Sequence, residues 1–176
     1  MGDTYLLDAM MIGRLIDDRP DDEVPEGTRN FRKHSAAAGD PNIVICSITL
    51  GEVEYGLAVA PASFGDDNKA EVRRVLRRFV HVLEVSKNAA VPHWAETRAR
   101  LFLKRSPGSE RQRRRLARWP EDLVERTPAK QLGIQENDLW LASVALEHNL
   151  VLVSADRMRH IKDVCPDLKW ENWLRP

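Results

Sequence analysis

Residues 138–156 read DLWLASVALEHNLVLVSAD, and they carry the clearest structural signal in the chain. Asp138 to His148 predicts a strongly apolar helix, and Leu150 to Val153 predicts a short strand that is buried on both faces. A helix that leads directly into a buried strand is typical of an α/β domain built on a parallel sheet. An acid stands at each end of this stretch, because Asp138 opens the helix and Asp156 follows the strand.

The rest of the chain repeats this alternation of short apolar runs and amphipathic segments. Further strands are predicted at residues 5–7, 43–46, 82–85 and 168–173, and helices at residues 9–16, 28–38, 49–60, 66–80, 89–103 and 157–164. A short basic helix is predicted at residues 109–119. We therefore expect one α/β domain over residues 1–176, with a parallel five-stranded sheet flanked by helices on both faces.

Composition excludes several classes of protein. The 27 Lys and Arg balance the 27 Asp and Glu, which excludes a nucleic-acid-binding protein that is basic as a whole. The two cysteines, Cys46 and Cys165, form no CxxC pair, which excludes a thiolate zinc site. No apolar run approaches the ~20 residues that a membrane-spanning helix needs, and no signal peptide is recognisable at the N-terminus. We therefore expect a cytoplasmic protein with no membrane partner.

Four acids lie where a parallel sheet places its chemistry. They are Asp8 at the end of the first predicted strand, Glu52 near the start of the helix after the second, Asp138 at the start of the apolar helix, and Asp156 after the fourth strand. Ligands of such sheets bind beyond the carboxyl ends of the strands. We therefore expect the four carboxylates to converge at that edge.

Each acid also has an interpretation that involves no chemistry. Thr49-Leu50-Gly51-Glu52 has the spacing of a capping box, which would make Glu52 a helix cap. Asp8, Asp138 and Asp156 all stand where an acid stabilises the start of a helix. Capping does not require the four acids to lie at the same end of the sheet, so their joint position is the stronger indication of a site.

Convergence of four carboxylates favours a bound cation. Two carboxylates 4 Å apart repel by ~1 kcal/mol in water and by ~4 kcal/mol at the dielectric constant of a protein surface. Four of them together need either protonation or a metal ion. Ligands that are all oxygen suit Mg²⁺ or Mn²⁺ rather than Zn²⁺. Such an ion activates water and neutralises the charge of a phosphodiester.

Four motifs, in order along the chain, resemble those of PIN domains, and most closely those of VapC-type toxin ribonucleases. They are Tyr5-Leu6-Leu7-Asp8, residues 48–56 (ITLGEVEYG), residues 136–142 (ENDLWLA) and residues 152–156 (LVSAD). The resemblance implies a five-stranded parallel sheet and an endoribonuclease that depends on Mg²⁺ or Mn²⁺. It implies a toxin that a cognate antitoxin protein holds inactive, and a homodimer. It also implies a catalytic metal site formed by Asp8, Glu52, Asp138 and Asp156.

The sequence departs from this family in three places. Met10 stands two residues after the first acid, where the family usually has Asn, Ser or Thr, so a polar group beside the metal is lost. Ser154 replaces the usual Thr but keeps a hydroxyl, and together with Thr49 it is expected to support the acids. The chain is also long for the family. We expect the extra length to form insertions at residues 17–40 and 105–131.

A basic segment is the second functional feature of the sequence. Residues 98–118 contain nine Lys or Arg and one acid, Glu110. The segment predicts an RNA-binding surface that holds phosphates near the acids, a solvated helix face, or an anchor for an acidic antitoxin segment. The arginines at the centre of the run are Arg111, Arg113, Arg114, Arg115 and Arg118.

Two functions of different classes follow from these features. The first is a ribonuclease, a hydrolase that cleaves RNA phosphodiester bonds with metal-activated water. The alternative is a PIN-like module whose catalysis Met10 has weakened, and which binds RNA or a protein through the arginine-rich segment. A carboxylate-metal phosphatase is disfavoured, because Asp8-Ala9-Met10 lacks the required Asp-x-Asp. Glu54 and Glu136, two further acids close to the motifs, are interpreted as solvated or supporting acids.

Overall fold

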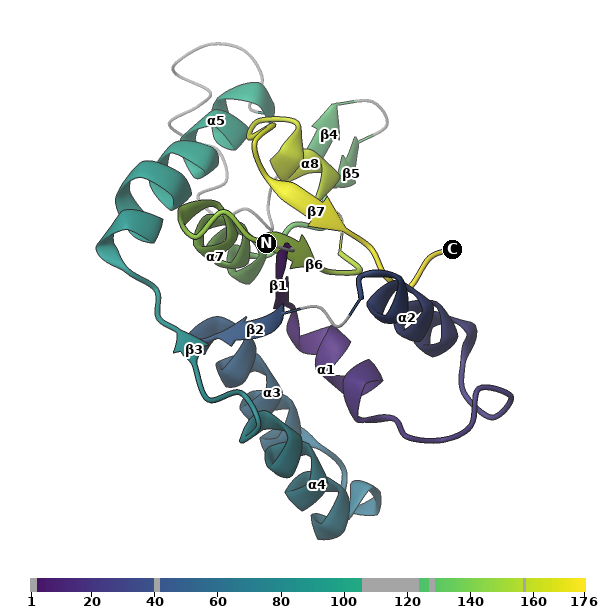
Figure 1. Ribbon diagram of the computed structural model, residues 1–176. Coiled ribbons are helices and arrows are strands. Elements are labelled where there is room, and N and C mark those ends of the chain that lie inside the picture. Colours follow the sequence, from purple (N-terminus) through teal and green to yellow (C-terminus); the bar gives the residue numbers. More distant parts are fainter. Residues whose placement is uncertain (1–2, 40–41, 106–123, 127–128, 157) are drawn as a thin grey trace.

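Five parallel strands form the sheet at the centre of the chain (Figure 1). The computed structural model describes residues 3–39, 42–105, 124–126, 129–156 and 158–176. The strands are β1 (Thr4–Leu7), β2 (Asn42–Cys46), β3 (Val82–Leu83), β6 (Val151–Val153) and β7 (Lys169–Glu171), in the order β3-β2-β1-β6-β7. In the central strand β1, Leu6 pairs with Val44 of β2 and Leu152 of β6. The prediction of a parallel five-stranded sheet is confirmed.

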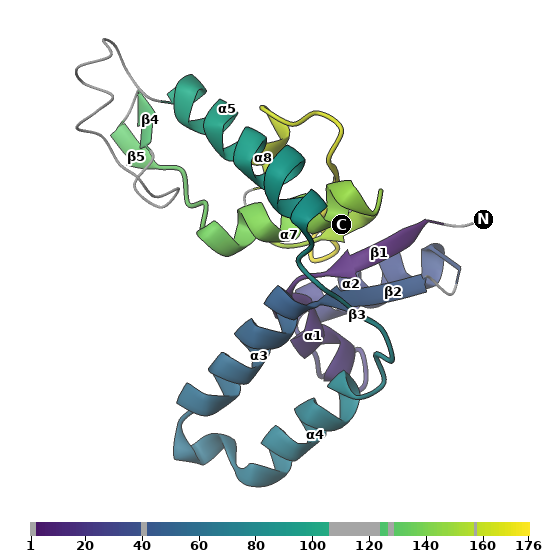
Figure 2. The same cartoon turned by 90° about the vertical axis from the view of Figure 1, so that its left-hand side faces the viewer.

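Helices cover both faces of this sheet. Neighbouring residues of a strand point to opposite faces, so each strand contributes side chains to two cores. Leu6 and Leu152 belong to a core shared with α5, α7 and α8, whereas Leu7 and Val153 belong to a second core shared with α1, α2 and α4. Figure 2 shows the two layers on either side of the strands. The helices are α1 (Ala9–Ile16), α2 (Glu26–Ala37), α3 (Ser47–Val59), α4 (Asp66–Leu76), α5 (Glu96–Arg105), α7 (Glu136–Glu147) and α8 (Arg159–Lys162).

The helix predicted at 9–16 has the predicted bounds, whereas the helices predicted at 28–38, 138–148 and 157–164 are found at Glu26–Ala37, Glu136–Glu147 and Arg159–Lys162. Three other predicted helices also differ from the structure. The helix predicted at 49–60 begins earlier, at Ser47, directly after β2. The helix predicted at 66–80 ends at Leu76, while Phe79 continues the apolar stripe by packing against the same core from the following turn. The helix predicted at 89–103 is π-helical over Ala89–Ala95 before α5 begins. Pro92 explains this widening, because proline has no N–H to donate to a regular helical turn.

The region between α5 and α7 contains an antiparallel hairpin that was not predicted, formed by β4 (Val124–Arg126) and β5 (Ala129–Gln131). The basic helix predicted at residues 109–119 lies outside the described residues. The assignment of residues 17–40 and 105–131 as insertions stays a prediction. In the described ranges, no helix combines the length and the apolar character needed to cross a bilayer.

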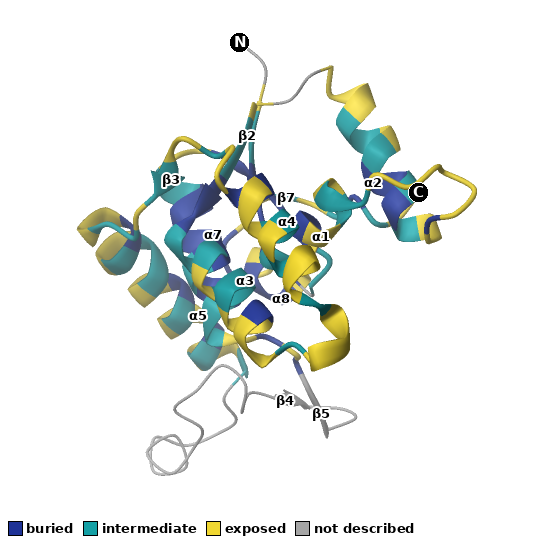
Figure 3. Cartoon of the chain, turned by 90° about the horizontal axis from the view of Figure 1, so that it is seen from below, coloured by how far each residue is buried: buried dark blue, intermediate teal, exposed yellow. Residues whose placement is uncertain are grey.

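The C-terminal segment, residues 172–176, packs between α2 and the sheet. The Trp173 side chain is only 1% exposed, and its ring centroid lies 5.0 Å from that of Tyr5 on β1 and 5.4 Å from that of Phe31 on α2. The amide nitrogen of the Asn30 side chain donates to the carbonyl of Leu174 at 3.1 Å. Figure 3 shows α2 beside the C-terminus. Residues 26–37 therefore belong to the same core as the sheet.

Replacing Trp173 with Ala is expected to lower the free energy of unfolding by about 3–5 kcal/mol, because the change removes a buried aromatic ring and leaves a cavity between α2 and β1. Urea unfolding followed by circular dichroism measures this difference. As a control, Arg175→Ala removes an exposed side chain from the same segment and should change the free energy by less than about 0.5 kcal/mol. A Trp173→Ala protein as stable as the control would contradict this packing role.

Candidate active site

The carboxyl ends of β1 and β6 open into a cleft of about 650 Å³. Asp8 follows β1, Asp156 follows β6, and Glu52 reaches the cleft from α3. The other lining residues are Ala9, Met10, Ser47, Ile48, Gly51, Tyr55, Gln135 and Asn137. Three of the four predicted acids therefore line one cleft, although they are far apart in the sequence.

Asp8 is almost fully buried, with 4% of its surface exposed. Its Oδ2 accepts a hydrogen bond of 2.6 Å from the hydroxyl of Ser154, and the same hydroxyl accepts one of 3.1 Å from the backbone N–H of Asp156. Asp8 occupies the N-cap position of α1 but makes no capping hydrogen bond with its side chain. Ser154 therefore joins the residues that follow two neighbouring strands, and Asp8 stands at the start of α1, as predicted, without capping it through a side-chain hydrogen bond.

Glu52 is held by a residue that sequence reasoning did not single out. The side-chain amide of Asn137 donates to Glu52 Oε1 at 2.7 Å. The capping-box interpretation of Thr49 and Glu52 is wrong, because α3 begins two residues earlier with Cys46 as its N-cap. Instead, the Thr49 hydroxyl donates to the carbonyl of Leu7 at 2.8 Å and ties α3 to the end of β1. The sequence signal for Asn137 is its place beside Asp138 in the ENDLWLA motif, in the first turn of a helix.

Asp138 combines a capping role with a place among the acids. Gln135 and Asp138 form a capping box, in which Asp138 Oδ2 accepts the backbone N–H of Gln135 at 2.7 Å. The capping interpretation is therefore confirmed for Asp138. It is wrong for Asp156, because α8 has Met158 as its N-cap.

The four carboxylates interact electrostatically. Burial raises the pKa of Asp8 to about 6; the Ser154 hydroxyl opposes the rise, and the charges of Asp156 and Glu52 add to it. Burial likewise raises the pKa of Asp138 to about 7; the Gln135 N–H opposes the rise, and the charges of the three other acids, Asp156 first, add to it. Asp8 and Asp138 are therefore close enough to other acids for those charges to favour their protonated forms.

The donor set of this cleft suits a hard divalent cation, since the candidate ligands are carboxylate oxygens and no sulfur or imidazole is among them. Within the described ranges, no three His, Cys, Asp or Glu side chains already stand as a preformed metal cluster. Hydrogen bonds from neutral groups hold Asp8, Glu52 and Asp138. Because these donors are uncharged, they do not compensate the negative charge of the carboxylates.

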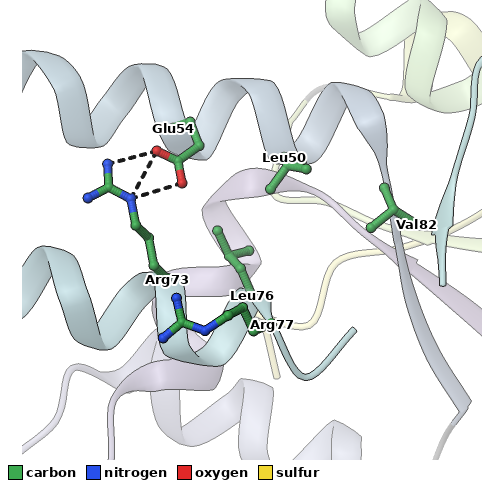
Figure 4. A pocket seen from close by; sticks show the side chains of 6 residues that line it. All are labelled: Leu50, Glu54, Arg73, Leu76, Arg77 and Val82. Carbon is green, nitrogen blue, oxygen red and sulfur yellow. Dashed lines mark hydrogen bonds and ion pairs between the residues drawn. The ribbon is translucent and has the colours of Figure 1, made fainter. Parts of the chain in front are cut away.

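Glu54 and Glu136, the two further acids close to the motifs, are paired with arginines, unlike the acids of the cleft. Glu54 faces away from the cleft, and both of its oxygens accept hydrogen bonds from Arg73 on α4, at 2.9–3.2 Å. Figure 4 shows this pair over a smaller pocket of about 240 Å³ with Leu50, Leu76 and Val82 in its wall. Glu54 is thus an ion-paired surface acid.

Glu136 is also paired. Its Oε1 accepts hydrogen bonds from Arg98 at 3.0 Å and from the indole N–H of Trp94 at 2.9 Å. The Trp94 ring stacks on Trp140 with a centroid distance of 4.6 Å. Glu136 therefore anchors the first turn of α7, which carries Asn137 and Asp138.

The predicted basic surface can be followed only in part. Arg98, Arg100 and Arg105 form ion pairs with Glu136, Glu96 and Asp163, in that order. The arginines at the centre of the prediction lie outside the described residues; they are Arg111, Arg113, Arg114, Arg115 and Arg118. Their role in binding RNA stays a prediction.

A family model and several solved structures both support the fold. The chain matches the PIN domain family over residues 5–165. Its structure is similar to that of VapBC2 from Rickettsia felis bound to a DNA fragment from its promoter, with a TM-score of 0.57 and 22% identity over 97% of this chain and 98% of that chain. A search of curated proteins found no match.

Two other solved structures show the same likeness. FitAcB from Neisseria gonorrhoeae gives a TM-score of 0.61 and 14% identity over 98% of this chain and 100% of that chain. VapBC-1 from nontypeable Haemophilus influenzae gives a TM-score of 0.56 and 21% identity over 98% of this chain and 99% of that chain. Each likeness spans nearly the whole of both chains, so the fold is shared from end to end.

Asp138→Asn is expected to stabilise the metal-free protein at pH 8. Because burial raises the pKa of Asp138 in the folded protein to about 7, the folded protein keeps a proton that the unfolded chain releases near pH 4. The stability from this proton is full below about pH 4 and is lost as the pH rises through 7. Asn avoids the loss, and its amide oxygen still accepts the Gln135 N–H. We expect a gain of up to about 4 kcal/mol at pH 8 in EDTA.

Urea unfolding in EDTA at pH 4, 6 and 8 measures this effect. The advantage of Asp138→Asn should grow with pH and disappear toward pH 4. Asp67→Asn, which changes an exposed acid on α4, should show no such trend. An equal difference at all three pH values would show that burial of the charge is not the cause.

Proposed function

The chain belongs to the PIN domain family, and we propose that it is an endoribonuclease that hydrolyses RNA phosphodiester bonds at the acidic cleft with Mg²⁺ or Mn²⁺. One observation carries the proposal: four acids from separate segments interact with one another, and those that are hydrogen-bonded are held by neutral donors. This arrangement is costly for a purely structural site and useful for a site that binds a cation.

The four acids have two different roles in the proposed reaction. Asp8, Asp138 and Asp156 would hold the ion, which supplies positive charge that activates water and offsets the charge of the phosphodiester. Glu52 has one oxygen fixed by Asn137, and its other oxygen would accept a hydrogen bond from the attacking water and orient it. Ser154 keeps Asp8 and the Asp156 backbone in register. Departure of the ribose 3′-oxygen would leave 5′-phosphate and 3′-hydroxyl ends.

We further infer that the protein acts in the cytoplasm as the toxin of a toxin-antitoxin pair. The structural neighbours include VapBC2 from Rickettsia felis and VapBC-1 from Haemophilus influenzae, and VapBC-5 from Mycobacterium tuberculosis belongs to a toxin-antitoxin family. The expected partners are a cognate antitoxin protein and a second copy of the chain. A small DNA-binding protein encoded directly beside this chain would support the inference, and its absence would weigh against it.

Purified protein is expected to cleave RNA in Mg²⁺ or Mn²⁺ and to lose this activity in EDTA, because the carboxylates need the ion to act on a phosphodiester. Asp8→Asn should abolish cleavage. Asp67→Asn, an exposed acid outside the cleft, should leave cleavage unchanged. Gel analysis of a labelled RNA and of its end groups provides the measurement. Cleavage that persists in EDTA would contradict the metal mechanism.

Calorimetric titration with Mn²⁺ separates the nuclease from the alternative of a weakened binding module. That alternative draws on Met10, an apolar side chain that is 49% exposed and lines the cleft beside Asp8. A nuclease should show saturable binding that Asp8→Asn removes. A module that has lost its metal should show none.

Asn137→Ala is expected to lower kcat/KM for RNA cleavage by about tenfold to a hundredfold, because partners that orient an active-site carboxylate typically contribute this much. The Asn137 side chain is only partly buried, so thermal unfolding should change little. Steady-state cleavage rates measure the effect. Unchanged kcat/KM would show that the hydrogen bond to Glu52 is not needed.

A further inference from the structure

One face of α3 forms a wall of the acidic cleft. Ile48, Gly51, Glu52 and Tyr55 line the cleft together. Their spacing of three and four residues places them on the same side of the helix. Whatever occupies the space beside Glu52 therefore also meets Gly51 and Tyr55, on the same turn of the helix and on the next one.

Tyr55 is a solvent-exposed aromatic side chain in the wall of the cleft. It is 70% exposed, and within the described residues no hydrogen bond or ring contact involves it. In the part of the chain that the structure describes, the next most exposed Phe, Tyr or Trp among the exposed hydrophobic side chains is Phe64, at 37%. A flat ring beside the acids offers a stacking surface for a flat, uncharged group.

Gly51 leaves open space on the same face. It lies inside α3, where Ala would stabilise the helix, and a methyl group built on it would meet no atom within 4 Å. The packing of the chain therefore does not require glycine at this position. Because Gly51 lines the cleft, the space that it leaves is available to a bound molecule.

We propose, on the basis of the nuclease function proposed above, that Tyr55 stacks on a base of single-stranded RNA next to the cleaved phosphodiester, and that Gly51 leaves room for the sugar-phosphate backbone to cross α3. Aromatic side chains stack on unpaired bases of RNA, whereas the bases of a duplex are stacked on one another and present no free face. The cleft therefore selects unpaired nucleotides.

Binding of a single-stranded RNA that contains 2-aminopurine tests the stacking role. The fluorescence of this base falls when it stacks, and Ca²⁺ replaces Mg²⁺ so that binding is measured apart from cleavage. Tyr55→Ala is expected to weaken binding about tenfold and to reduce the quenching, since a stacked base contributes this order of affinity. Tyr55→Phe, which keeps the ring, should bind within about twofold of wild type.

Val59→Ala is the matched control for Tyr55→Ala, because Val59 is an exposed side chain one turn further along α3 that does not line the cleft. It should bind like wild type. A duplex of the same sequence should bind with the same affinity to wild type and to Tyr55→Ala. Single-strand binding that is equal in Tyr55→Ala and wild type would overturn the proposal.

Gly51→Ala gives a second test with effects of opposite sign. The change is expected to raise Tm by about 2–4 °C, because Ala favours the helix and meets no atom of the protein. It should also raise KM for RNA severalfold. Gly56→Ala is the matched control, since Gly56 has the same open surroundings but lies outside the cleft. It should raise Tm by a similar amount and leave KM unchanged.

The outcomes separate this proposal from the proposed function. If the wild-type protein binds single strands through Tyr55 but never cleaves them, the nuclease function fails and the stacking role stands. If it cleaves RNA and neither Tyr55→Ala nor Gly51→Ala alters KM, the stacking role fails and the nuclease function stands. A Tyr55 that matters only for binding a protein partner would also overturn the proposal.

Discussion

The site depends on the burial of carboxylates next to other acids at the carboxyl ends of β1 and β6. At a spacing of 4 Å, each pair of charges costs about 4 kcal/mol at the dielectric constant of a protein surface. The chain neutralises nearby acids with arginine, as Arg73 does for Glu54 and Arg98 does for Glu136. Inside the cleft it uses neutral donors instead. Burial, and after it the charges of the neighbouring acids, raises the pKa values of Asp8 and Asp138. The difference separates acids that serve the fold from acids that hold a cation in the function that we propose.

The topology of the sheet brings these acids together. Parallel strands end at the same edge, so residues that follow neighbouring strands become neighbours even when they are far apart in the sequence. β1 lies between β2 and β6, so Asp8 is flanked by the helix that follows β2 and by the turn that follows β6. Thr49 strengthens this arrangement by bonding to the carbonyl of Leu7. The site is therefore a consequence of strand order as well as of residue type.

The sequence predicts what depends on local pattern and fails where tertiary contacts decide. Buried strands and amphipathic helices have their own periodicity, which is why the helix after β1 was predicted at residues 9–16, as found. The predicted start of α3 was wrong because the helix begins directly after β2. Thr49 therefore lies inside the first turn of α3 and not at its N-cap. The hydrogen bond from Asn137 to Glu52 joins residues 85 positions apart, and a local sequence pattern cannot predict such a contact. Asp138 was read correctly as a cap, and the charges of the three other acids also act on it, although it does not line the cleft.

An acidic cleft in a chain with no net charge raises the question of what holds a polyanion there. In the ranges that the structure describes, Arg98, Arg100 and Arg105 of the basic run form ion pairs with acids. Their positive charge is therefore partly neutralised within the protein. Stacking on Tyr55 would supply affinity that needs no positive charge and depends little on salt, whereas phosphate contacts weaken steeply as salt rises. A bound cation would then remove the repulsion at the acids, and the ring would hold a neighbouring base in place. Attraction and chemistry would thus come from adjacent turns of one helix.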